Sequence, residues 1–352
     1  MTDEPPPPDM VQELAASVAQ DALPPAPQKT LRPGGTAARV HQLIFHGKGG
    51  SLLGIYTINI LLTLLTVGIY YFWGKTRIRS YMMSQTEFAG DRFAYHGTGK
   101  ELLVGFLKAT VLFGIPLAAL IIAPEFLEPR VIVGAVASLV ATCMVMVAIP
   151  VAMVGARRYR LSRTSWRGVL FSFRGSAKEF IKVFLSGSLL MIPTIGLYYP
   201  FFETKKHAFM VSHSYFGNKR FQFDGRGRDL FGSFLLALLL FLPTLGLYWF
   251  WFLAKKHRFF WEHTSFASAR FRSTVTGGRL FLLKLGNLLL LLATLGLAWP
   301  WVVVRNARFT LRYLTLEGPL DLAAIEQQAQ AASATGEGLA SFLDMDAGFG
   351  FG

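Results

Sequence analysis

The sequence is poor in charged residues and nearly lacks cysteine. Charged residues make up 16% of the 352 residues, and Cys143 is the one cysteine. Soluble chains carry about 25% charged residues, so a set of ordinary soluble domains is disfavoured, and a single thiol excludes a disulfide-stapled scaffold. Hydrophobic residues reach 52% and the mean hydropathy is +0.41. This composition predicts an integral membrane protein.

The charges that are present divide the chain into three parts. Residues 1–36 are acidic and rich in Pro, and residues 317–352 hold six acids and no base, so we expect both segments to be mostly disordered tails. The part between them, 37–316, holds 33 bases against 10 acids and forms the membrane domain. No basic stretch followed by an apolar run stands at the N-terminus, so we expect no cleavable signal peptide.

The middle part contains six apolar segments, each about long enough to cross a ~30 Å hydrocarbon core as a helix. The fold class expected from them is an integral membrane, mainly α-helical protein. The segments cover residues 51–73, 102–123, 131–154, 183–202, 230–254 and 285–304.

Four of these segments share a Thr-x-Gly motif, which predicts an internal repeat because many offsets recur together. The motif Gly lies at 68, 196, 246 and 296, an aromatic follows at the fifth position and a base at the ninth. We interpret the motif as a helix break, since Gly ends helices, and as architecture rather than chemistry. Its residues are Thr66, Gly68 and Tyr70, Thr194, Gly196 and Tyr198, Thr244, Gly246 and Tyr248, and Thr294 and Gly296.

Short segments of alternating aromatic and polar residues separate the apolar runs. Alternation with period two, ended by Gly, predicts short amphipathic β-strands. The segments are 42–47, 92–97, 170–175, 220–225, 270–273 and 312–316.

The Phe-x-Gly lead, the Thr-x-Gly-Ile/Leu-Tyr core and the bases after it resemble the YjgN-like family, uncharacterised bacterial inner-membrane proteins defined by a domain of unknown function. The similarity covers about residues 40–318, and the fourth copy departs from it because Ala298 replaces Tyr. The resemblance implies a multi-pass protein of the bacterial inner membrane and supplies no catalytic, cofactor or ligand residues.

The distribution of Lys and Arg leaves two topologies open. If all six runs cross, the bases divide 20 to 14 between the two sides; if only 102–123 and 131–154 cross, they divide 33 to 1. A strong bias toward the cytoplasmic side is the rule, which favours motif segments that are re-entrant or interfacial. Plain crossings remain the commoner arrangement of apolar runs of this length.

Four histidines are weak candidates for a metal site: His207, His213, His257 and His263. Their spacing of six puts the two rings of each pair on different helix faces, and adjacent lysines disfavour a cation, so a basic interfacial helix is the simpler interpretation. No catalytic grouping is visible, and we expect neither an enzyme nor a cofactor.

Two functions follow as hypotheses. The first is a membrane scaffold or lipid-interacting protein whose Lys and Arg bind anionic headgroups, with a protein partner for the acidic C-terminal tail. The alternative is a permease or channel-like transporter of a small uncharged substrate. Ionisable residues are nearly absent from the apolar runs, which favours the first, because transporters usually place such residues in crossing helices. Nucleic acid is excluded as a partner, since no basic stripe stands apart from an apolar segment.

Overall fold

The computed structural model describes residues 40–320, together with Ile325 and Leu339. The sequence predictions for residues 1–36, and for most of the acidic tail, lie outside the described residues. The strands are β1 (Val40–Phe45), β2 (Thr86–Phe88), β3 (Asp91–Tyr95), β4 (Thr164–Trp166), β5 (Val169–Phe173), β6 (Ser214–Phe216), β7 (Lys219–Phe223), β8 (Thr264–Phe266), β9 (Ala269–Ser273) and β10 (Leu314–Glu317). The α-helices are α2 (Gly49–Leu65), α3 (Tyr71–Ser84), α4 (Gly99–Ala109), α5 (Ile115–Ile122), α6 (Arg130–Ser162), α7 (Ala177–Met191), α8 (Tyr199–Ser212), α9 (Gly227–Leu239), α10 (Trp249–Glu262), α11 (Gly277–Ala293) and α12 (Trp299–Arg312).

The ten strands form one closed antiparallel barrel, in which each strand pairs with its neighbours in sequence and β1 pairs with β10. Two-residue turns join the hairpins: Ala89 and Gly90 both have positive φ, as do Arg167 and Gly168, which matches the twist of the paired strands. Between one hairpin and the next the chain leaves as a helix and returns as a second helix.

The barrel interior is filled with aromatic and aliphatic side chains. Because side chains alternate along a strand, one position of every strand points inward. The short strands and β10 contribute Phe88, Trp166, Phe216, Phe266 and Leu316, and the longer strands contribute Leu43, Phe93, Phe171, Phe221 and Phe271. Neighbouring rings lie close, with centroids 4.6 Å apart for Phe171 and Phe216 and for Phe221 and Phe266. The barrel is therefore a packed core.

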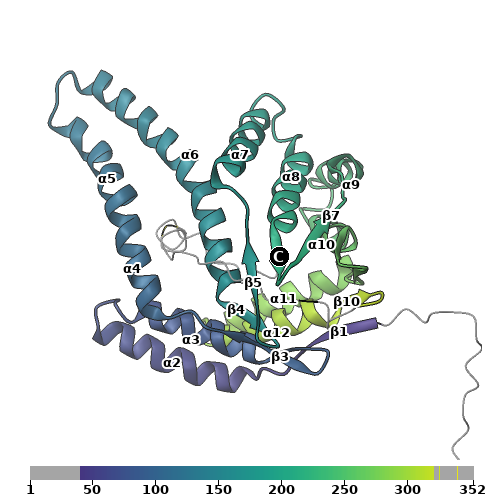
Figure 1. Cartoon of the computed structure of the whole chain (residues 1–352). Coiled ribbons are helices and arrows are strands. Elements are labelled where there is room, and N and C mark those ends of the chain that lie inside the picture. Colours follow the sequence, from purple (N-terminus) through teal and green to yellow (C-terminus); the bar gives the residue numbers. More distant parts are fainter. Residues whose placement is uncertain (1–39, 321–324, 326–338, 340–352) are drawn as a thin grey trace, which may run out of the picture. The chain divides into compact units, whose positions relative to one another are not determined.

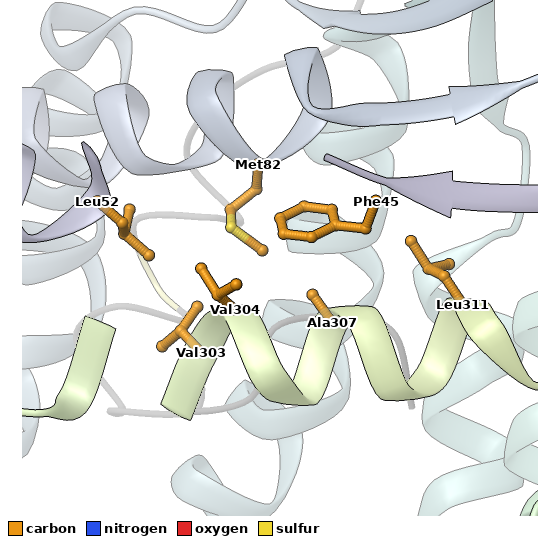
Figure 2. Packing of buried hydrophobic residues seen from close by; sticks show 7 residues of the cluster. All are labelled: Phe45, Leu52, Met82, Val303, Val304, Ala307 and Leu311. Atoms are coloured by element: carbon orange, nitrogen blue, oxygen red, sulfur yellow. The ribbon is translucent and has the colours of Figure 1, made fainter. Parts of the chain in front are cut away.

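The helices form a continuous series in which each packs against the next, and α12 packs against α2 and β1. Figure 2 shows this last contact, where Val304 and Ala307 of α12 face Met82 of α3 and Phe45 of β1. Leu52, Val303 and Leu311 complete this buried cluster. The closure of the barrel and the closure of the helix series thus depend on contacts between residues about 250 positions apart.

Two helical segments are long and apolar enough to cross a membrane by length and composition, Gly99–Glu125 and Arg130–Ser162. The first contains α4 and α5, joined by the π-helical turn Thr110–Gly114, and the second is α6. Figure 1 shows them as a hairpin, and α5 packs on α6. Only 11% of the most apolar window of each segment is buried within the chain, as expected of helices that contact lipid.

The expected fold class, a mainly α-helical protein with six membrane segments, is wrong. Strands form at the alternating segments, but they close a ten-stranded barrel, and four short strands (β2, β4, β6 and β8) were not expected. Only two helical segments in the described residues are candidates for crossing. The error has a physical cause: an apolar run of 20–25 residues has the same composition whether it crosses a bilayer or turns back at its middle.

Candidate functional site

Each Thr-x-Gly motif forms the tip of a helical hairpin, where one helix ends and the next begins. At the tip between α2 and α3, the Thr66 hydroxyl donates to the carbonyl of Leu62 (2.7 Å) and accepts from the N–H of Tyr70 (2.9 Å). One side chain thus both stops the first helix and satisfies a backbone donor of the second. Thr194, Thr244 and Thr294 make the same two bonds in their own tips.

The motif glycine reverses the chain. Gly68 has φ +91°, and its N–H donates to the carbonyl of Thr63, five residues earlier. This bond is typical of an α-helix whose C-terminus ends in the left-handed conformation. Gly196, Gly246 and Gly296 have φ between +80° and +88° and make the equivalent bond. The four tips therefore turn the chain back, so that α2 packs on α3, α7 on α8, α9 on α10 and α11 on α12.

The residue before each motif glycine is apolar, strained and exposed. Val67, Ile195, Leu245 and Leu295 have φ between +47° and +50°, a region that costs an L-residue about 1–2 kcal/mol and is rare above all for β-branched side chains. Their exposed fractions are 92–93%. We call these four residues the tip residues. Side chains this exposed gain little from packing on the rest of residues 40–320.

The aromatic residues five positions after the motif glycines pack against glycines at the starts of other helices. Trp73, Trp251 and Trp301 lie against Gly99, Gly277 and Gly49, the first residues of helices α4, α11 and α2. A Cβ at Gly99 would lie 2.5 Å from the ring of Trp73. Phe201 packs on Gly227 in the same way. Gly49, Gly99, Gly227 and Gly277 are thus sites of close approach between one hairpin and the next.

The four candidate histidines are not brought together. The His207 ring stacks on Phe260 at 4.2 Å and meets the edge of Phe223. The His257 ring lies 3.1 Å from the Ser273 hydroxyl and accepts from the Trp261 indole N–H. His213 and His263 each lie 2.8 Å from the carbonyl four residues earlier. Within the described residues, no group of three His, Cys, Asp or Glu side chains could hold a metal ion.

An ionic cluster beside these histidines joins α8 to α10. The Glu203 carboxylate accepts from Lys206 and from Lys256, whose Nζ is 2.8 Å away and also donates to Tyr199. Burial raises the pKa of Glu203, but the two ammonium groups outweigh it and hold that pKa below its usual range. Burial also lowers the pKa of both His207 and His257 to about 4, so both imidazoles are neutral at pH 7.

A cavity of about 1110 Å³ lies between α2, α3 and α6 and reaches the tip of α11 and α12. Its walls are largely apolar, and four cationic side chains also line it: Lys75, Arg79, Arg157 and Arg160. Sequence analysis missed this site because its cations come from two helices about 80 residues apart. We call it the basic cavity.

Leu339, from the acidic C-terminal segment, is buried beside this cavity. Its exposed fraction is 1%, and it packs with Ala109, Ala148, Ala152 and Ala156. Ala156 also lines the basic cavity. Leu339 thus lies in a groove of small residues.

Comparison with known proteins identifies relatives of unknown function. The family model described as "Bacterial protein of unknown function (DUF898)" matches residues 40–250 and 234–342. Inner membrane protein YjgN of Escherichia coli K12 is 32% identical over 47% of this chain and 39% of its own length. The Salmonella typhimurium protein of the same name is 30% identical over 40% of this chain and 33% of its own length. The aligned part is well under half of each relative. No solved structure matches.

Proposed function

The chain belongs to the DUF898 family of bacterial proteins and is located in the bacterial inner membrane, and from this premise we propose that it is a non-enzymatic scaffold that interacts with lipid. The hairpin of α4, α5 and α6 anchors it across the bilayer, and the four hairpin tips enter one leaflet.

The tip residues carry this proposal. At positive φ a turn most often holds Gly or Asn, and the barrel turns also hold Ala and Arg, yet all four tip positions hold Val, Ile or Leu. Transfer of such a side chain from water into an apolar phase is worth about 1.5–3 kcal/mol, which is of the same size as the strain of about 1–2 kcal/mol or larger. Insertion into lipid therefore offsets a cost that the fold alone does not.

The dimensions of the hairpins agree with entry into one leaflet. The first helices of the four motif hairpins, α2, α7, α9 and α11, have 13–17 residues, about 20–26 Å at 1.5 Å per residue, against a hydrocarbon core of ~30 Å. The base nine positions after each motif glycine lies six residues after the first residue of the returning helix, about 9 Å along it. These bases are all exposed: Arg77, Lys205, Lys255 and Arg305. From that depth their long side chains extend toward the anionic headgroups.

The recurrence of the hairpins supports an internal repeat as part of this proposal. The order strand, helix, helix, strand occurs five times within residues 40–320, and the α4–α6 hairpin fills the place of a motif hairpin in the second unit. A transporter has less support, because a path along the barrel axis would have to displace the packed aromatic core. The protein partner of the acidic segment stays a prediction.

Depth measurements at the tips test the proposal. Cys143 is replaced by Ser, and single cysteines at Ile195 and Leu245 are spin-labelled in nanodiscs that contain phosphatidylglycerol. We expect the labels to be accessible to oxygen and shielded from a water-soluble nickel complex. Lys178→Cys, an exposed site in the first turn of α7, is the control and should show the reverse. Tip labels as accessible to nickel as the control would refute insertion.

A further inference from the structure

The basic cavity runs from the barrel to the hairpin tips. At one end its wall includes Leu43, Phe93 and Phe171, which also pack against the barrel core. At the other end it includes Leu64, in the tip of α2 and α3, and Leu297, in the tip of α11 and α12. The exposed fractions of these two leucines are 73% and 75%. The cavity therefore meets the surface of the molecule among exposed apolar side chains beside the tips.

The wall between these two ends is largely apolar and adaptable. Met82 and Met83 of α3, Met153 of α6 and Met210 of α8 are among its lining residues. Methionine side chains are flexible and fill irregular spaces, so several of them together suit an occupant that has no fixed shape. A large space with apolar walls takes up apolar molecules in preference to water.

The cations of the wall do not define the occupant, because they already interact with other groups. Arg157 donates to the Ser214 hydroxyl at 3.3 Å. Lys75, Arg79 and Arg160 each have an interaction partner within the chain. An occupant therefore gains chiefly by removing apolar surface from water, and it does not have to be an anion.

We propose that the basic cavity holds one long acyl chain taken up from the surrounding leaflet. Leu53 and Leu64 line the cavity from the same helix, α2, and lie eleven positions apart, which is about 17 Å at 1.5 Å per residue. This length is close to half of the ~30 Å hydrocarbon core, the depth of one leaflet, which the acyl chains of that leaflet span. The inference rests on the proposed function, because entry of the tips into the leaflet brings the exposed end of the cavity into contact with lipid.

Photocrosslinking of the full chain in nanodiscs tests the site. The probes are a phosphatidylcholine with a diazirine in one acyl chain and a free fatty acid with the same diazirine chain. We expect crosslinks at Met153 and at Met82, which is only 2% exposed, in addition to crosslinks at the tip residues. Labelling by the phosphatidylcholine would assign the bound chain to a phospholipid, and labelling by the fatty acid alone would assign it to a free fatty acid.

Matched variants locate the bound chain. Met153→Trp narrows the cavity from α6 with all charges kept and should lower crosslinking at Met82 about fivefold, because the indole takes the space of the acyl chain. Met146→Trp places the same ring at an exposed site of the same helix and should leave crosslinking at Met82 unchanged. If Met153→Trp does not fold, Leu53→Trp narrows the cavity from α2 and should act in the same way.

The pattern of crosslinks separates the two proposals. Wild-type crosslinking at Met82 in the folded cavity variants overturns the acyl-chain site. Crosslinks confined to the tip residues also overturn it, but they leave the proposed function standing. Tip residues without crosslinks would refute the proposed function and, with it, the route into the cavity.

Discussion

Acidification should destabilise this protein through His207, and the structure allows the size of the effect to be worked out. The ring is mostly buried between Phe260 and Phe223, and burial is the first cause of its lowered pKa, followed by the charge of Arg157; Glu203 opposes the shift and Lys256 adds to it. The pKa falls from 6.5 to about 4.

The sign follows from proton binding in the two states. Between pH 6.5 and 4 the unfolded chain binds a proton at His207 that the folded chain does not, so the free energy of unfolding falls as the pH falls through this window. A pKa difference of this size corresponds to about 3 kcal/mol in the free energy of unfolding. The protein loses this stability in full below pH 4. His257, with its pKa also lowered to about 4 by burial, contributes over the same window.

Unfolding of the protein in detergent micelles, followed between pH 7 and pH 4, measures the effect. His207→Phe keeps the aromatic stack on Phe260 but cannot take up a proton, so we expect it to lose about 3 kcal/mol less than the parent over this range. If His207→Phe and the parent lose stability equally, the reasoning from burial is refuted.

Two further changes test the packing between hairpins. Glu203→Gln leaves Lys206 and Lys256 without their shared counter-charge. Because these groups are only partly buried, we expect the free energy of unfolding at pH 7 to fall by about 2 kcal/mol in the same unfolding assay. An unchanged free energy of unfolding would show that the cluster does not stabilise the fold. Gly187→Ala places a Cβ against the ring of Phe202 and should cost about 1–3 kcal/mol. A double variant with Phe202→Leu should recover most of that loss, and additive losses would contradict the contact.

The sequence by itself determined the features that depend on short stretches of chain. The membrane class follows from composition, and the tip chemistry follows from bonds that span four or five residues, such as those of Thr66 and Gly68. The family resemblance came from the same local motifs. Strand segments were visible because alternation is also a local property.

Tertiary structure decided how these pieces are joined. The pairing of β1 with β10, the packing of Trp301 on Gly49, and the meeting of Arg157 with Lys75 across one cavity all unite residues that are tens to hundreds of positions apart. Hydrophobicity is not directional, so an apolar run alone specifies burial but neither its partner nor its path. The closed barrel determines that the motif segments turn back, because it holds both ends of every hairpin on one ring of strands.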